Sequence, residues 1–242
     1  MTERHIVAMG GGGFADEADV PLDDFTLRLT GRRRPRVCFL PTATANVATY
    51  IVLFYSAFGG RSRASHLDLF VRGTADPRSI LLDQDLIYVG GGNTANLLAI
   101  WRTHGVDSIL REAWQAGVVL AGVSAGAICW FEGGTTDSFG PQLGPLTGAL
   151  GILPGSFCPH YDGEATRRPA FHGQIHDGRL PDGWAADDGA ALHFVGTELA
   201  EVVTARPEAA AYRVERRGDG VDERRLDVRH LAARRRRAGR IG

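Results

Sequence analysis

The stretch from Gly117 to Trp130, GVVLAGVSAGAICW, constrains the fold more than any other part of the chain. Its apolar residues 118–121 form a short run bounded by glycines, which is typical of a buried β-strand. The small residues that follow allow a sharp turn into a helix-compatible segment, with Ser124 at the apex. A strand–turn–helix of the form G-x-S-x-G is a nucleophile elbow, which presents a serine hydroxyl above the end of a sheet. The sequence therefore predicts an α/β protein with Ser124 as a candidate nucleophile.

Short apolar runs alternate with helical segments along the chain, and this alternation predicts βαβ units and a mainly parallel sheet. The expected strands in the first two thirds lie at residues 5–9, 37–40, 66–70, 86–89, 118–121 and 150–153. The expected helices lie at 23–30, 45–58, 76–82, 106–115 and 127–131, with one more after residue 94. In the C-terminal third, strands at 187–194, 199–204, 210–216 and 224–228 are expected as antiparallel additions to the same sheet.

The length and composition describe an ordinary globular chain. With 242 residues, we expect one α/β domain over 1–242, in which 229–242 form a basic, partly disordered tail. The net charge of −1 gives no bias toward nucleic acid or anionic membranes. We find no signal peptide before Ile6 and no apolar run of membrane-spanning length. The three cysteines do not suggest a disulfide framework, so we expect a cytoplasmic location.

Two glycine-rich loops follow expected strands and should meet Ser124 at the carboxyl edge of the sheet, where ligands bind in such folds. Gly10–Gly13 lacks the spacing of a phosphate-binding loop, so we expect close backbone approach near an active site instead. Gly90–Thr94 allows its N–H groups to approach a ligand and, together with the Ala125 N–H, to form an oxyanion hole. The alternative for this second loop is a simple turn in which Asn93 or Thr94 caps the next helix.

A serine needs an adjacent base to act as a nucleophile. Among the eight histidines, His160 has the best context, because it follows an expected strand downstream of the elbow. The loop after the elbow carries two acids, Glu132 and Asp137, that could orient a histidine. The pair Asp187 and Asp188 precedes a later strand; we expect it to form a turn, with binding of a substrate amino terminus as the alternative.

Taken together, GVVLAGVSAGAICWFE with TDSFG, then LPGSFCPHYDGE, and the loop YVGGGNT resemble the peptidase E family, serine peptidase family S51, which includes aspartyl dipeptidases and cyanophycinase. The resemblance runs from about Val37 to Val203. It implies a class I glutamine amidotransferase-like (flavodoxin-like) three-layer fold and a Ser–His–acid triad. Residue by residue, it implies Ser124 as nucleophile, His160 as base and acid, and Gly92 and Ala125 as oxyanion donors. Asp137 is the implied third member, with Glu132 and Glu164 as rivals.

The same resemblance implies hydrolysis of short peptides, with an N-terminal aspartate as one candidate specificity. Peptidase E holds the aspartyl carboxylate with an arginine, and Arg167 or Arg168 could supply such a bidentate clamp here. This segment departs from the family pattern by an inserted residue and a missing later arginine, so two solvated surface arginines are an equal alternative. Asn93 is the remaining candidate for substrate binding.

Two other functions compete with a serine peptidase. Cys158, His160, His172 and His176 could supply four ligands to the zinc of a metal hydrolase, although Pro169 and Gly173 weaken the helix this would need. A non-catalytic amidotransferase-like domain that binds a ligand would keep the same fold. We expect no metal and no cofactor, a small peptide as substrate, and neither nucleic acid nor membrane as a partner; a homodimer remains open.

Overall fold

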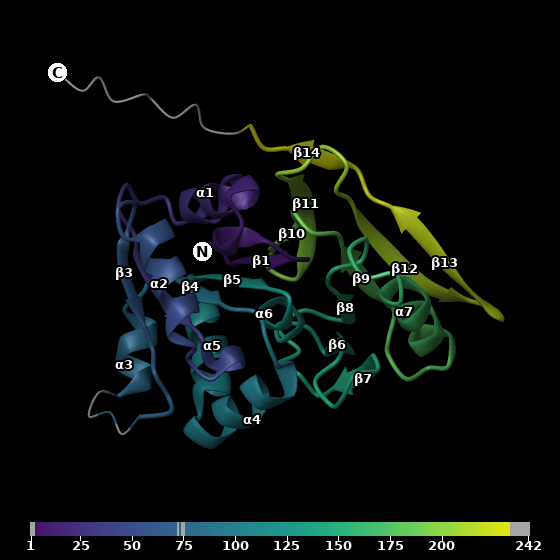
Figure 1. Ribbon diagram of the computed structural model, residues 1–242, viewed down its shortest axis with the longest axis horizontal. Coiled ribbons are helices and arrows are strands. Elements are labelled where there is room, and N and C mark those ends of the chain that lie inside the picture. The colour runs from purple at the N-terminus through teal and green to yellow at the C-terminus, as the bar shows by residue number, and fades with distance from the viewer. Residues whose placement is uncertain (1–2, 72, 74–75, 233–242) are drawn as a thin grey trace.

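The computed structural model describes residues 3–71, 73 and 76–232, and its larger sheet has eight strands in this region (Figure 1). The strand order is β14-β11-β10-β1-β5-β4-β2-β3. These strands are β1 (His5–Met9), β2 (Arg36–Leu40), β3 (Arg63–His66), β4 (Leu86–Val89), β5 (Val119–Val123), β10 (Ala190–Val195), β11 (Glu198–Thr204) and β14 (Val228–His230). The five strands from β1 to β3 in this order are parallel, whereas β10 pairs antiparallel with both β1 and β11. The predicted mainly parallel α/β sheet is therefore confirmed.

Helices cover both faces of this sheet, which gives three layers (Figure 1). Alternate strand residues point to opposite faces, so Val7 and Met9 pack with α1 and α2, whereas Ile6 and Ala8 pack in the core that α3 to α6 cover. The first layer contains α1 (Val20–Leu29) and α2 (Ala48–Phe58). The other contains α3 (Pro77–Leu82), α4 (Thr94–His104), α5 (Val106–Gln115) and α6 (Ala125–Ile128). Single 3-10 turns lie at η1 (Gly13–Ala15), η2 (Glu17–Asp19) and η3 (Thr42–Thr44).

A second sheet, which the sequence did not lead us to expect, has six strands among the described residues, in the order β13-β12-β9-β8-β6-β7. Its strands are β6 (Gly133–Thr136), β7 (Gly144–Thr147), β8 (Ser156–Cys158), β9 (Gly183–Ala186), β12 (Ala211–Arg217) and β13 (Gly220–Arg225). The helix α7 (Arg167–His176) packs on it around Phe171 and Ile175. The C-terminal additions were thus right for β10 and β11, whereas β12 and β13 belong to the second sheet.

Aromatic rings join the two sheets. Phe131 follows α6 and stacks on Phe157 of β8, with ring centroids 5.1 Å apart. The same ring meets Phe194 of β10 edge-on at 5.8 Å. Phe131 is fully buried, so one side chain contacts a strand of each sheet and fixes how they pack.

Several predicted boundaries were wrong. The strand expected at 66–70 lies instead at β3, because residues 63–66 pair with β2, while Leu67 and Leu69 are buried without joining the sheet. Residues 150–153 form no strand; the amides of Leu150, Gly151 and Leu153 donate to carbonyl oxygens of residues 129–131 and close a loop against the end of α6. The second strand of the last hairpin, β13, starts at Gly220, four residues before the strand expected at 224–228. Of the expected tail, 229–230 belong to β14, and 233–242 lie outside the described residues.

Within the part of the chain that the structure describes, no helix has both the length and the apolar character needed to cross a bilayer.

Candidate active site

Ser124 stands at the turn between β5 and α6, as the sequence predicts. Its backbone has φ 55° and ψ −116°, a conformation that costs a non-glycine residue energy and that tight neighbours must hold in place. The residues two positions before and after Ser124 must be glycines, because neither has room for a β-carbon. A β-carbon on Gly122 would lie 1.9 Å from the Gly126 carbonyl oxygen, and one on Gly126 would lie 2.4 Å from the Val89 carbonyl oxygen. The G-x-S-x-G pattern therefore has a direct steric cause here.

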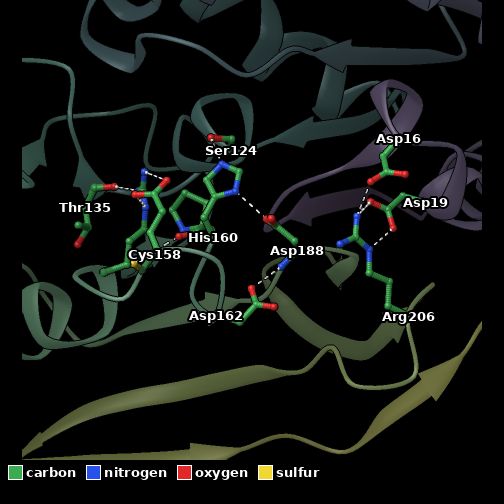
Figure 2. A network of polar contacts seen from close by, with 12 residues as sticks. Asp16, Asp19, Ser124, Thr135, Cys158, His160, Asp162, Asp188 and Arg206 are labelled. Atoms are coloured by element: carbon green, nitrogen blue, oxygen red, sulfur yellow. Dashed lines mark hydrogen bonds and ion pairs between the residues drawn. The ribbon is translucent and has the colours of Figure 1, made fainter.

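His160 reaches Ser124 from the second sheet, two residues after β8 ends. Its Nε2 lies 2.8 Å from Ser124 Oγ (Figure 2). The His160 amide donates to the Gly10 carbonyl oxygen at 3.3 Å, and the residue has a positive φ of 52°. The pairing of these two side chains, predicted from the elbow's need for a base, is thus present in the geometry.

Asp188 holds the other side of the imidazole. Its Oδ1 lies 2.6 Å from His160 Nδ1, and Figure 2 shows Ser124, His160 and Asp188 in a continuous chain. A carboxylate can only accept, so this contact keeps the hydrogen on Nδ1 and leaves Nε2 free to accept the Ser124 hydroxyl hydrogen. The hydrogen bond from His160, followed by the positive charges nearby, lowers the pKa of Asp188, so the carboxylate form is stabilised.

The structure contradicts the prediction that Asp137 orients the histidine, because Asp188 occupies that position. Asp137 is an exposed residue of the loop after β6. The two alternative candidates for this role also have other partners: Glu132 accepts from the Gly155 amide, and Glu164 pairs with Arg167. Asp188 was missed because it follows β9, whose sequence GWAA was not recognised as a strand. Recognising β9 as parallel to β8 would have brought the residues after both strands to one edge.

The Gly10–Gly13 loop makes the close approach that the sequence predicts. A β-carbon on Gly11 would lie 1.9 Å from Asp188 Oδ1 and 2.7 Å from His160 Nδ1, so only glycine leaves room for that pair. The Gly11 carbonyl oxygen accepts from the Gly189 amide at 3.3 Å. The loop after β1 thus packs directly on the carboxylate–imidazole pair.

Arg206 connects the segment that follows the Gly10–Gly13 loop to the turn that carries Asp188. Its guanidinium donates to both oxygens of the fully buried Asp19 at 2.9 Å, and to Asp16 at 2.7 Å (Figure 2). The arginine stem covers Gly189, where a β-carbon would lie 2.6 Å from Arg206 Cγ. Its charge also contributes to lowering the pKa of Asp188. No sequence pattern pointed to Arg206, which is distant in sequence from both aspartates.

The proposed oxyanion donors flank the serine. Ala125 is the first residue of α6, and Gly92 is exposed, with φ 132°. Within residues 3–71, 73 and 76–232, neither amide donates to a protein acceptor. Ala125 directly follows Ser124 in the chain, and Gly91, the neighbour of Gly92, approaches the serine so closely that a β-carbon there would be 3.4 Å from Ser124 Cβ. Both amides are therefore available to a ligand beside Ser124.

Asn93 has the capping role that was one of its two predicted uses. Its Oδ1 accepts from the Asn96 amide at the start of α4, and its Nδ2 donates to the Ser138 carbonyl oxygen at 3.0 Å. The side chain therefore fixes the loop after β4 to the loop after β6.

The two arginines proposed as a carboxylate clamp already have partners. Arg167 is buried, makes two hydrogen bonds to Glu164 and donates to the Thr135 carbonyl oxygen. The Arg168 guanidinium lies over Tyr161 and Tyr212 and pairs with Glu223 at 3.4 Å. A substrate carboxylate would therefore compete with Glu164 or Glu223 for the guanidinium.

The alternative zinc ligands do not come together. Among the described residues, no group of three or more His, Cys, Asp or Glu side chains is placed to hold a metal. His172 pairs with Glu223 at 2.9 Å, His176 contacts Asp177 at 3.2 Å, and Cys158 is buried in the core. Residues 167–176 do form a helix, despite Pro169 and Gly173, because Pro169 lies in its first turn.

Comparison with known proteins shows the family of the chain. Residues 6–202 match the model of peptidase family S51, a match that starts earlier than the predicted resemblance and includes the Gly10–Gly13 loop. The chain is 52% identical over 232 residues to the uncharacterized peptidase YgaJ of Bacillus subtilis (strain 168), which covers 94% of this chain and 99% of that protein. It is 35% identical over 111 residues to peptidase E of Shewanella denitrificans, covering 46% of each chain.

The fold is also similar to the crystal structure of a peptidase from an acI-B1 Actinobacterium. That similarity has a TM-score of 0.71 at 20% identity and covers 93% of this chain and 95% of that one. The chain belongs to peptidase family S51 and is a serine-type peptidase.

Proposed function

We propose that Ser124, His160 and Asp188 are the catalytic triad of a peptidase that acts on short peptides. One observation carries the proposal: two consecutive hydrogen-bond contacts, of 2.8 Å and 2.6 Å, run from the serine hydroxyl through the imidazole to the carboxylate. A nucleophile, a base in reach of it and a group that orients the base are the parts that acyl transfer requires.

In this proposal, Ser124 Oγ attacks the peptide carbonyl carbon while His160 Nε2 takes the hydroxyl proton. The carbonyl oxygen gains negative charge, and the amides of Gly92 and Ala125 donate to it. His160 then returns the proton to the leaving amine as the C–N bond breaks, which leaves an ester on Ser124. A water molecule, deprotonated by His160 in turn, attacks that ester and releases the acid and the free serine.

Asp188 keeps its negative charge throughout this cycle. It holds the Nδ1–H tautomer and stabilises the imidazolium that forms each time His160 takes a proton. The low pKa of Asp188 supports this role, because the carboxylate remains ionised across the neutral range.

The proposal includes dipeptides among the substrates and a cytoplasmic location. Cys38, Cys129 and Cys158 are free and buried, as suits a protein of a reducing compartment. Cys129 lies just after α6 and donates to the Gly126 carbonyl oxygen, so it serves the core and does not compete with Ser124 as nucleophile.

The test is a screen of short peptides with the wild-type chain and Ser124→Ala, combined with labelling by a fluorophosphonate probe. We expect peptide hydrolysis and labelling at Ser124 in the wild type, and a fall in kcat of at least about 10⁴-fold in the variant with its fold intact. Correctly folded wild-type protein that neither labels nor hydrolyses any peptide would favour the non-catalytic binding domain.

A further inference from the structure

The segments that carry His160 and Asp188 leave the second sheet side by side. The strands that precede them, β8 and β9, are parallel neighbours, so the chain after each strand enters the same space. Beyond the last strand pair, the Tyr161 amide donates to the Ala186 carbonyl oxygen at 3.2 Å. The contact between the imidazole and the carboxylate is therefore one of several between these two segments.

Asp162 makes a further contact between them, which the catalytic cycle described above does not use. Its Oδ1 accepts from the Asp188 amide at 2.9 Å (Figure 2). Asp188 is thus held twice by one short segment, because its side chain meets the His160 ring and its backbone meets the carboxylate two residues further on. The contacts close a ring, which restricts both the backbone of Asp188 and the direction of its carboxylate.

The residues on either side of Asp188 have separate anchors. The Asp187 amide donates to the Ala210 carbonyl oxygen at 3.0 Å, and Asp187 Oδ2 accepts from the Ala210 amide at 2.9 Å. The Gly189 amide donates to the Gly11 carbonyl oxygen at 3.3 Å. These anchors hold the turn as a whole, so we expect the turn to survive loss of the contact at the Asp188 amide.

The backbone of His160 also depends on its neighbours. Its φ of 52° lies in the left-handed region, which costs a non-glycine residue energy and persists where surrounding contacts hold it. The His160 amide donates to the Gly10 carbonyl oxygen on one side, and the Asp162 contact follows on the other. Asp162 is itself exposed, so it can be replaced without opening the core.

We propose that Asp162 is a positioning residue, which sets the distance between the Asp188 carboxylate and the His160 imidazole by accepting from the Asp188 amide. The inference rests on the proposed peptidase function and adds to it a residue outside the triad. The acceptor oxygen is the part that matters, because an amide N–H needs only a lone pair as its partner. Small errors in the placement of a catalytic group slow a reaction substantially, so a contact that does not reach the serine still affects turnover.

The experiment compares Asp162→Ala, Asp162→Asn and Asp182→Ala with the wild type on one peptide. Asp162→Ala removes the acceptor and should lower kcat by about five- to tenfold with KM nearly unchanged. Asp162→Asn keeps an acceptor oxygen and should restore kcat to within about twofold of the wild type. Asp182 is the matched control, since its Oδ1 accepts from the Arg216 amide at 2.8 Å at the opposite end of β9. Its replacement should leave kcat unchanged.

Proton NMR gives a second readout, which does not need turnover. The hydrogen on His160 Nδ1 lies in a contact of 2.6 Å to a carboxylate and should give a strongly downfield resonance in the wild type. We expect this resonance to move upfield or to broaden in Asp162→Ala, and to be kept in Asp162→Asn and Asp182→Ala. Circular dichroism and urea unfolding check that each variant is folded.

The outcomes separate this inference from the triad. If Asp162→Ala keeps the wild-type kcat or the wild-type resonance, the contact is structural only and the inference is overturned. If Asp162→Asn loses as much activity as Asp162→Ala, the charge matters instead of the acceptor, and the inference is again overturned. If the wild type neither hydrolyses a peptide nor labels with a fluorophosphonate, the peptidase proposal fails, and the NMR comparison alone decides whether Asp162 positions Asp188.

Discussion

Gly11 lies against Asp188 so closely that the carboxylate occupies the space of a side chain at position 11. Gly11→Ala should push Asp188 away from His160 Nδ1 and lower kcat by at least about tenfold, because loss of an oriented base slows proton transfer. Kinetics with circular dichroism as a check on the fold measure this. Gly60→Ala is the matched control, since a β-carbon there meets nothing within 4 Å. Equal activity in the two variants would contradict the steric argument.

The choice between two aspartates can be tested directly. Asp188→Asn should lower kcat by about 10³- to 10⁴-fold, because an amide cannot stabilise the imidazolium and favours the wrong tautomer. Asp137→Asn removes the exposed carboxylate first predicted for this role and should change kcat by less than about twofold. The measurement is kcat and KM for both variants on one peptide. A larger loss in Asp137→Asn would reverse the assignment.

Arg206 is expected to act on catalysis through Asp188 without touching the substrate. Arg206→Ala leaves the buried Asp19 without its partner and removes a positive charge that lowers the pKa of Asp188. We expect a lower kcat with KM nearly unchanged, and partial rescue by Arg206→Lys. In the Asp188→Asn variant, Arg206→Ala should lower kcat by a much smaller factor than in the wild type, and a double-mutant cycle measures this difference.

The control for that cycle is Arg217→Ala, which removes an exposed arginine paired with Glu215 and should leave kcat unchanged. Additive losses for Arg206→Ala and Asp188→Asn would mean that the arginine acts independently of the triad.

Asp23 predicts a specific pH dependence of stability. The residue is fully buried, and burial raises the pKa of its carboxyl from 3.8 to about 7. Between these two values the folded protein keeps a proton that the unfolded chain releases, so this group makes the free energy of unfolding fall as pH rises. The slope from this one group is at most about 1.4 kcal/mol per pH unit, and it ends above the folded-state pKa.

Urea unfolding of Asp23→Asn and wild type at pH 5, 6, 7 and 8 tests this. The variant should gain relative stability as pH rises to about 7, because its amide does not ionise. Asp137→Asn is the surface control and should run parallel to wild type across the series. A constant difference between Asp23→Asn and wild type would contradict the raised pKa.

The features that could be predicted from sequence are those encoded in short local patterns. The elbow at Ser124 depends on glycines two residues to either side, and that requirement is visible in five letters. The parallel strands β1, β2, β4 and β5 are continuous apolar runs, because both faces of the larger sheet are covered by helices. The helix expected at 76–82 has a local cause as well, because the Asp76 side chain caps α3 by accepting from the Arg78 and Ser79 amides.

The features that were missed depend on contacts between distant segments. The strands β6, β8 and β9 read GGTT, SFC and GWAA, which are short or glycine-containing and resemble turns until the second sheet pairs them. Asp188 owes its position to β9, so its role was hidden with that strand. The burial of Arg167 likewise depends on a distant segment, because its guanidinium donates to the Thr135 carbonyl oxygen of β6.

The Ser124 hydroxyl and the His160 imidazole that activates it come from different sheets. Ser124 follows β5 of the larger sheet, His160 follows β8 of the smaller one, and Asp188 lies in the connection from β9 of the smaller sheet to β10 of the larger. A small shift of one sheet relative to the other would therefore alter the distance between the Ser124 oxygen and the His160 imidazole. The rate of hydrolysis therefore depends on how the two sheets pack, so shortening the fully buried Phe131 side chain, which contacts Phe157 and Phe194, is expected to slow the enzyme.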